Sequence, residues 1–74
     1  MSNNIAIRIG KSIKKHRDAA GLTQEQLAEK VGVGRVAVAR WEIGATSPSL
    51  EMIETVAKIL GVHPAVVAVE IFSE

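Results

Sequence analysis

The 74-residue chain has no cysteine and no tyrosine, and aromatic residues make up only 3% of it. The lack of cysteine excludes disulfides and thiolate zinc sites, which fits a reducing, cytoplasmic interior. With so few aromatic rings, the core must be aliphatic. The chain also lacks any run of about 18 or more apolar residues and any charged-then-apolar N-terminal segment. We therefore expect no membrane-spanning helix and no signal peptide.

What the chain does contain is enough apolar material for one small core. Hydrophobic residues make up 47% of it, too many for a disordered chain, and the length suits a single domain over residues 1–74. The net charge is only +1, but residues 1–40 hold eight Lys and Arg against three acidic residues, whereas residues 41–74 hold one against five. The basic half suggests a side that faces a polyanion, although a solvated helix face explains the same charges.

Apolar residues recur at helical spacing along most of the chain. Ile5, Ile9 and Ile13 repeat every four residues. Thr23 and Gln26 have the spacing of a capping box, which marks the start of another helix. The fold class that we expect is all-α, a compact bundle of four to five short helices. The expected helices span residues 4–20, 24–31, 35–42, 49–60 and 64–71.

The last of these elements is ambiguous. Residues 65–72, Ala-Val-Val-Ala-Val-Glu-Ile-Phe, contain many β-branched side chains, which favour a strand. Pro64 near the start of the element and the short connection from the preceding helix favour a helix instead. We expect a helix.

The most informative stretch is residues 24–41, where apolar side chains fall on one face of a first helix and then on one face of a second. The positions concerned are Leu27, Ala28, Val31, Val38 and Trp41. Gly32 lies between the two helices, where a tight turn needs a positive φ or a close backbone approach. Such a unit can hold its second helix away from the body of a domain, in the major groove of DNA.

From Thr23 to Gly44 the chain resembles the helix-turn-helix domains of the Cro and phage-repressor type, also called Xre-like regulators. The matching positions are Leu22-Thr23-Gln24, Leu27-Ala28, Val31-Gly32-Val33, Val38, Trp41-Glu42 and Gly44, followed by Pro48-Ser49-Leu50, Ile53, Ala57 and Leu60-Gly61-Val62. The resemblance implies a lambda-repressor-like bundle and a transcriptional regulator that binds double-stranded operator DNA as a symmetric dimer. It places the helix over residues 35–42 in the major groove. We also expect no cofactor, and no small-molecule ligand is evident from the sequence.

The resemblance also assigns roles to individual residues. Arg35, Val36 and Arg40 occupy base-facing positions. Arginine can bind guanine O6 and N7, and valine can contact a thymine methyl group. For each arginine, a phosphate contact or a solvated side chain is the alternative. The positions implied to contact phosphate are Thr23, Gln24, Ala39, Thr46 and Ser49.

Arg17 and Glu42 match a family pair that joins the first helix to the end of the third by a partly buried salt bridge. Such a bridge would orient the DNA-facing helix more than it would stabilise the fold. Two independent surface charges are the alternative.

We expect structural roles for Trp41, His16 and His63. Trp41 shares a helix face with Val38, so we expect it to pack in the core rather than stack on a base. We expect His16 to be half-buried at the edge of the first helix and His63 to cap the last one. With no cysteine and no acidic motif near either histidine, we expect no metal site.

The C-terminal stretch has more apolar residues than a terminal helix needs for core packing alone. We expect a homodimer interface there, because a monomer offers too few contacts for operator-grade affinity. Closure of the monomer core is the alternative. The expected interface residues are Val66, Val67, Val69, Ile71 and Phe72.

Several positions depart from the family pattern. Gly34 replaces the usual Ser or Thr before the third helix, which leaves a weaker cap. Ala37, Ala39, Ile43 and Thr46 replace residues that are often polar or basic. These losses motivate an alternative function, a protein-interaction module on a helix-turn-helix scaffold with weak DNA affinity, for example antitoxin-like. We do not expect an enzyme, because no nucleophile–base pair or phosphate-binding glycine loop is present.

Overall fold

The computed structural model describes residues 4–73, and this part of the chain forms five α-helices. The helices are α1 (Asn4–Ala19), α2 (Gln24–Val31), α3 (Arg35–Glu42), α4 (Leu50–Ile59) and α5 (Pro64–Phe72). The expected all-α class is confirmed, and the ambiguous last element is a helix. Each bound lies within one residue of the expected one.

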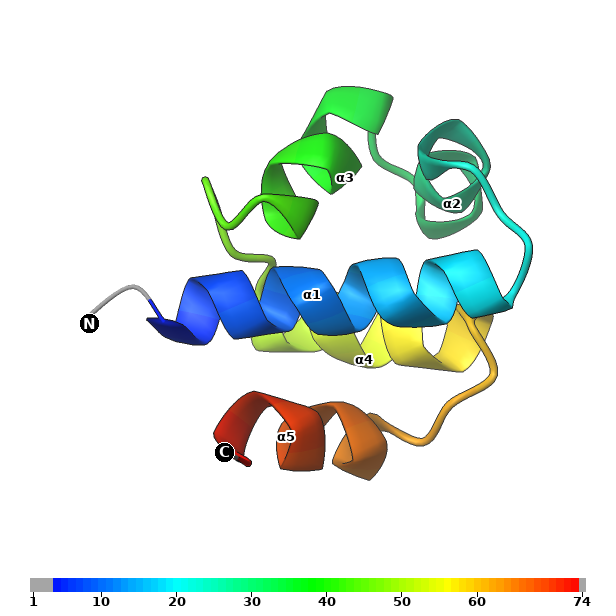
Figure 1. Ribbon diagram of the computed structural model, residues 1–74. Coiled ribbons are helices and arrows are strands. Elements are labelled where there is room, and N and C mark those ends of the chain that lie inside the picture. Colours follow the sequence, from blue (N-terminus) through cyan, green and yellow to red (C-terminus); the bar gives the residue numbers. More distant parts are fainter. Residues whose placement is uncertain (1–3, 74) are drawn as a thin grey trace.

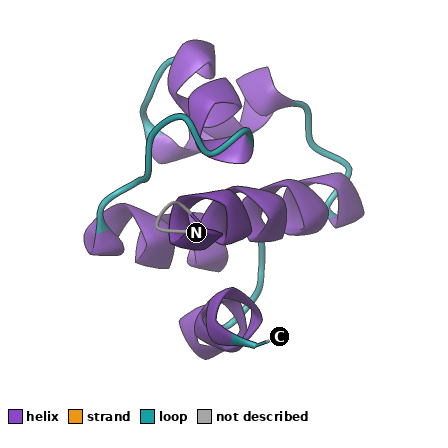
Figure 2. Ribbon diagram, turned by 60° about the vertical axis from the view of Figure 1, so that its left-hand side comes forward, coloured by secondary structure: helices purple, strands orange, loops and turns teal. Residues whose placement is uncertain are grey.

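The helices are arranged around α1, which runs through the middle of the molecule (Figure 1). α3 packs on one side of α1 and α5 on the other, while α2 packs against α3 and α4. A second view shows α5 as a separate layer below α1, far from α2 and α3 (Figure 2). The fold therefore presents α3 and α5 on opposite sides of a shared central helix.

The core is aliphatic, as the composition requires. Leu27 and Val38, one from each helix of the central unit, are fully buried. Trp41 is also buried, in the same cluster as Val38, and does not project into solvent. The remaining buried hydrophobic residues are Ile9, Ile13, Ala28, Val56, Ala57, Val67 and Ile71.

Local capping explains why residues 64–72 are helical despite their β-branched content. The ring Nδ1 of His63 accepts a hydrogen bond from the backbone N–H of Ala65 at 3.0 Å. Pro64 occupies the first helical position, where its missing N–H costs nothing and its fixed φ suits the helix. Together these two residues start the helix in place of a strand.

The expected dimer interface needs a correction, because α5 uses part of it to close the monomer core. Val67 and Ile71 are each only 5% exposed, so they cannot contact a second chain. Val66, Val69 and Phe72 are 40%, 63% and 71% exposed. The two sets lie on different faces because the helical period separates them. Counting apolar residues could not show which face turns inward.

A polar cluster fastens α5 to α1 beside these apolar contacts. The carboxylate of Glu70 accepts hydrogen bonds from Ser12 Oγ at 2.6 Å and Lys15 Nζ at 2.7 Å, and its Oε1 lies 2.9 Å from His16 Nε2. The hydrogen bonds from Lys15 and Ser12 lower the pKa of Glu70 from 4.5 to about 2. His16 is half-buried, and this carboxylate is its partner.

Neither a metal cluster nor a single membrane-crossing helix occurs within residues 4–73. No group of three or more histidine or carboxylate side chains there could hold a metal ion. α4 and α5 meet the length and composition of a membrane span only when taken together, and they are bent by 118° relative to each other. Both helices contribute side chains to the core, which accounts for their apolar character.

Candidate nucleic-acid interface

The turn between α2 and α3 forms as the glycine pattern predicts. Gly32 ends α2 in the left-handed conformation with φ of 84°, and its N–H donates to the carbonyl of Ala28. Gly34 stands at the N-cap of α3 without a side-chain hydrogen bond. The short connection sets α3 across the end of α2, and the start of α3 is the weakly capped end.

The start of α2 carries the expected capping box. Thr23 Oγ1 accepts from the backbone N–H of Gln26 at 3.0 Å, and Gln26 Oε1 accepts from the backbone N–H of Thr23 at 2.9 Å. This reciprocal pair fixes the first turn of α2. The capping box does not use the hydroxyl hydrogen of Thr23, so Thr23 Oγ1 can still donate a hydrogen bond to another group.

A buried polar network joins α1, α2 and α3 behind this surface. Arg17 binds Glu42 through two parallel hydrogen bonds, Nε to Oε2 at 2.6 Å and Nη2 to Oε1 at 2.9 Å. Arg17 Nη1 also donates to the carbonyl of Leu22 at 2.7 Å. The side chains of Arg17 and Glu42 are 9% and 2% exposed, and hydrogen bonding to Glu42 raises the pKa of Arg17. This geometry ties the last turn of α3 to α1.

Gln24 belongs to the same network. Its Nε2 donates to Oε1 of Glu42 at 2.9 Å, and the residue is half-buried. The amide nitrogen carries two hydrogens, so one remains for another acceptor while the first holds Glu42. This contact could not be predicted from the sequence, because Gln24 and Glu42 lie 18 residues apart and only the fold brings them together.

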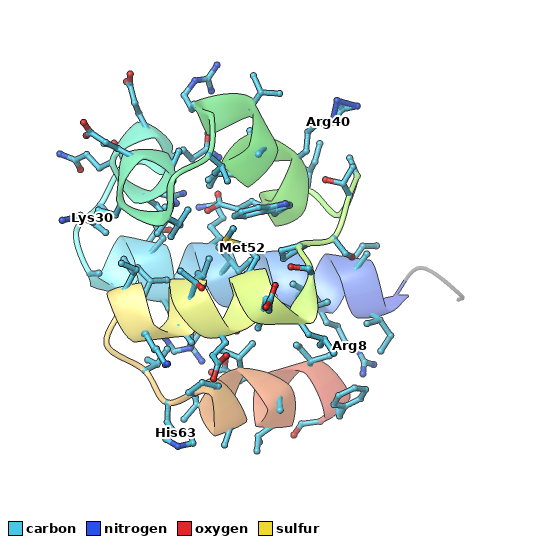
Figure 3. All side chains as sticks on the ribbon, turned by 180° about the vertical axis from the view of Figure 1, so that it is seen from behind. Arg8, Lys30, Arg40, Met52 and His63 are labelled. Atoms are coloured by element: carbon cyan, nitrogen blue, oxygen red, sulfur yellow. The ribbon has the colours of Figure 1, made fainter. Side chains whose placement is uncertain are left out.

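The outer face of α3 carries the expected base-facing residues. Arg35, Val36 and Arg40 are all exposed, and Val36 is 60% exposed. Within residues 4–73, neither guanidinium has an ion pair or hydrogen bond through its side chain. Arg40 projects away from the bundle, at the end remote from His63 and α5 (Figure 3). Two unpaired cations thus flank an apolar side chain on one protruding helix.

The other residues implied to contact phosphate lie around this helix. Ala39 is half-buried on α3, and Thr46 is exposed in the loop after it. Ser49 is the N-cap of α4, where its Oγ accepts from the N–H of Met52 at 3.1 Å. Ile43, the residue directly after α3, is 74% exposed.

A helix-turn-helix family model matches residues 13–67, which is most of the chain and includes all of α2, α3 and α4. The chain belongs to the helix-turn-helix family. Its type is that of the Cro and phage-repressor, or Xre-like, domains, as the sequence resemblance implied.

The chain is similar in sequence and in structure to helix-turn-helix regulators of other organisms. An uncharacterised HTH-type transcriptional regulator of Methanothermobacter thermautotrophicus is 49% identical over 49 residues, which make up 66% of this chain and 71% of that protein. The crystal structure of the clp gene regulator ClgR from Corynebacterium glutamicum matches with a TM-score of 0.86 at 27% identity, covering 90% of this chain and 71% of that one.

A second solved structure is similar over nearly its whole length. The restriction-modification controller protein C.AhdI from Aeromonas hydrophila matches with a TM-score of 0.77 at 33% identity, covering 90% of this chain and 91% of that one. This helix-turn-helix protein is therefore a DNA-binding transcriptional regulator and not an enzyme, which confirms both expectations.

Proposed function

We propose that this helix-turn-helix protein is a sequence-specific regulator that binds operator DNA in the cytoplasm as a homodimer, with α3 in the major groove. The observation that carries the proposal is the outer face of α3, where the side chains of Arg35 and Arg40 have no partner among residues 4–73 and Val36 is exposed between them. A guanidinium without an internal partner is available for guanine O6 and N7 or for phosphate.

The network behind α3 supports this role. Arg17 holds Glu42 at the end of α3, and Gln24 holds the same carboxylate from the start of α2. Through Glu42, α3 is therefore joined to both α1 and α2 by charge-assisted hydrogen bonds. A recognition helix that is fixed in this way loses little conformational freedom when it enters a groove.

Phosphate contacts would come from the edges of the same surface. We assign them to the residues around α3 whose side chains still have an N–H or O–H to donate, which are Thr23, Gln24, Thr46 and Ser49. Ala39, the fifth position implied by the resemblance, has no side-chain donor, and its backbone N–H lies inside α3, so it would only approach a phosphate. Because none of these residues is cationic, we expect non-specific affinity to be low and its salt dependence shallow, since only a phosphate neutralised by Lys or Arg adds about −0.9 to the slope.

The proposed dimer surface is the outward face of α5. Val66, Val69 and Phe72 follow one another at three-residue spacing and form a stripe. The other face of the helix closes the core through Val67 and Ile71. A helix that is apolar on both faces is typical of one that is buried on both.

The stripe continues onto neighbouring helices. Phe72 lines an apolar groove together with Ile5 and Leu50, and these two are 41% and 86% exposed. A two-fold pairing of this surface would give the dimer two copies of α3, and operator binding requires them to meet successive turns of the major groove, about 34 Å apart.

The test of the proposal is selection of binding sites from random DNA with the purified protein. We expect a two-fold symmetric site with guanine in each half-site. Arg35→Ala should then lower affinity for the selected site far more than for random DNA. An equal loss on both would make Arg35 a phosphate contact and remove its base-reading role.

The dimer is tested separately by sedimentation. Val69→Lys with Phe72→Lys should give a monomer, while Ile59→Lys, which alters an exposed apolar residue on α4 outside the stripe, should leave the dimer intact. A wild-type monomer at high concentration would contradict the dimer.

A protein-interaction module is the second candidate. The exposure of Ile43 beside a recognition helix with only two cations favours it. A titration with mixed-sequence DNA at increasing salt separates the two functions. Salt-sensitive binding with a sequence preference supports the regulator, and no binding at low salt supports the module.

A further inference from the structure

The side chains on the outer face of α3 can donate hydrogen bonds but cannot accept them. All eight residues of α3 are described, and its exposed side chains are those of Arg35, Val36 and Arg40. Glu42 is the one residue of α3 with side-chain acceptor atoms. It is 8% exposed and is held by Arg17 and Gln24. Arginine has donors only, and valine has no polar atom at all.

This donor-only surface restricts what α3 can recognise in a major groove. Guanine presents two acceptors, which suit arginine, whereas the amino groups of adenine and cytosine are donors that need an acceptor on the protein. The one further major-groove feature that needs no hydrogen bond is the C5-methyl group of thymine. Of the exposed residues on α3, Val36 is the one that can contact it through an apolar surface.

We propose that Val36 recognises the C5-methyl group of a pyrimidine and does not distinguish thymine from other pyrimidines that carry this methyl group. This proposal rests on the proposed function. Thymine and 5-methylcytosine carry the same methyl group and differ at C4, where one has a carbonyl oxygen and the other an amino group. Val36 has no atom that distinguishes these two groups. The ligand class is therefore DNA with a 5-methylpyrimidine at this position, and 5-methylcytosine replaces thymine there.

The neighbouring arginine makes one dinucleotide especially suitable. Arg35 directly precedes Val36, and its guanidinium has no partner among residues 4–73, so it is available for guanine O6 and N7. A 5-methylpyrimidine followed by guanine places a methyl group beside these two acceptors. Both thymine–guanine and 5-methylcytosine–guanine steps meet that requirement. Cytosine methylation at such a step would strengthen binding, so the protein would respond to the methylation state of its site.

The test uses full-length protein and synthetic duplexes of the site selected from random DNA. Each thymine is first replaced singly by uracil, which removes only the methyl group. At the position that Val36 contacts, we expect affinity to fall by about fourfold per half-site, the factor for burying one methyl-sized group. Cytosine and 5-methylcytosine are then compared at that position. The methylated duplex should bind about fourfold more tightly per half-site, and within about twofold of the thymine duplex.

Two variants identify the side chain responsible. Val36→Ala shortens an exposed residue without touching the core, and both methyl-dependent ratios should fall to about one. Ile59→Ala removes an exposed apolar side chain on α4 and should leave both ratios unchanged. Thermal unfolding of each variant checks that the fold persists.

The possible failures are distinguishable. If the protein prefers no duplex over random DNA, the proposed function itself is wrong. If it prefers its selected site but uracil equals thymine at every position, methyl recognition is wrong and the regulator stands. If uracil lowers affinity but 5-methylcytosine binds no better than cytosine, the protein recognises thymine by its carbonyl as well, and the replacement is wrong.

Discussion

Gly10 lies directly against the backbone carbonyl of Trp41. A Cβ placed on Gly10 would come within 2.1 Å of the Trp41 oxygen and 3.0 Å of the Glu42 carbonyl carbon. α3 therefore ends against α1 at a point where α1 has no side chain. Because the obstructing atoms belong to the backbone, they cannot rotate away as a flexible side chain would.

We expect a net destabilisation of about 1–3 kcal/mol from Gly10→Ala, because overpacking against backbone atoms outweighs the gain of about 1 kcal/mol that alanine normally gives over glycine inside a helix. Urea denaturation measures the difference. Lys11→Ala, at the exposed next position of α1, is the matched control and should change stability little. A Gly10→Ala protein as stable as wild type would show that α1 and α3 are not in such close contact.

Gly34→Ser should stabilise the protein. Gly34 is the N-cap of α3 with φ of −82° and no side-chain hydrogen bond, and a Cβ added there meets nothing within 4 Å. Serine would supply the missing acceptor, and the gain over glycine at an N-cap is a few tenths of a kcal/mol. Thermal unfolding gives the result, with Gly34→Ala as the control that adds the Cβ without the oxygen. Serine no better than alanine would contradict the capping argument.

Removing one partner of the Arg17–Glu42 pair should be severe. Without Arg17, the Glu42 carboxylate would stay buried with no opposite charge, which costs about 3–5 kcal/mol. Without Glu42, Arg17 would keep its ion pair with Asp18 at 3.2 Å, so the loss should be smaller. Arg17→Met and Glu42→Met together should cost less than the sum of the single changes, because no buried charge is left over. A double-mutant cycle by chemical denaturation measures this coupling. A coupling energy near zero would mean that the two charges act independently.

The double variant also separates stability from orientation. Where it remains folded, we expect weaker binding to the selected operator, since α3 is no longer tied to α1 through Glu42. Operator affinity equal to that of wild type would show that packing alone orients α3.

Glu70 should make stability fall in acid. Its pKa is lowered in the folded protein to about 2 from 4.5, because Lys15 and Ser12 bind the ionised form. The carboxylate therefore contributes stability that is fully present above about pH 4.5 and is lost as the pH falls toward 2. Glu70→Gln should be less stable at pH 7 and should lose less stability across that window. Glu51→Gln, which alters an exposed carboxylate on α4, is the control.

Denaturation at several pH values checks this prediction. If Glu70→Gln shows the same acid-induced loss as wild type between about pH 4.5 and 2, the carboxylate does not fasten α5 to α1.

Local chemistry made most of this fold predictable from the sequence. The Thr23–Gln26 capping box and the left-handed Gly32 depend only on residues close together in the chain, and both occur as expected. Pro64 and His63 decided between strand and helix for the same reason. Short-range rules of this kind act before tertiary packing is known.

Contacts between distant residues were harder to foresee. Ser12 and His16 are four residues apart on one face of α1, so a shared partner could have been suspected, but not that the partner is Glu70. α5 is apolar on both faces, and periodicity alone does not say that Val67 rather than Val66 turns inward. These outcomes depend on how α5 docks against α1 and α4.

Both the DNA-facing helix α3 and the proposed dimer helix α5 are attached to α1. Gly10 and Arg17 fix α3 on one side of it, while Ser12 and Lys15 fix α5 on the other. In a dimer that pairs through α5, α1 is a rigid spacer between the two-fold axis and each recognition helix. The number of base pairs between half-sites is then set by the thickness and tilt of one helix, and substitutions that shift α1 would alter operator spacing without touching DNA.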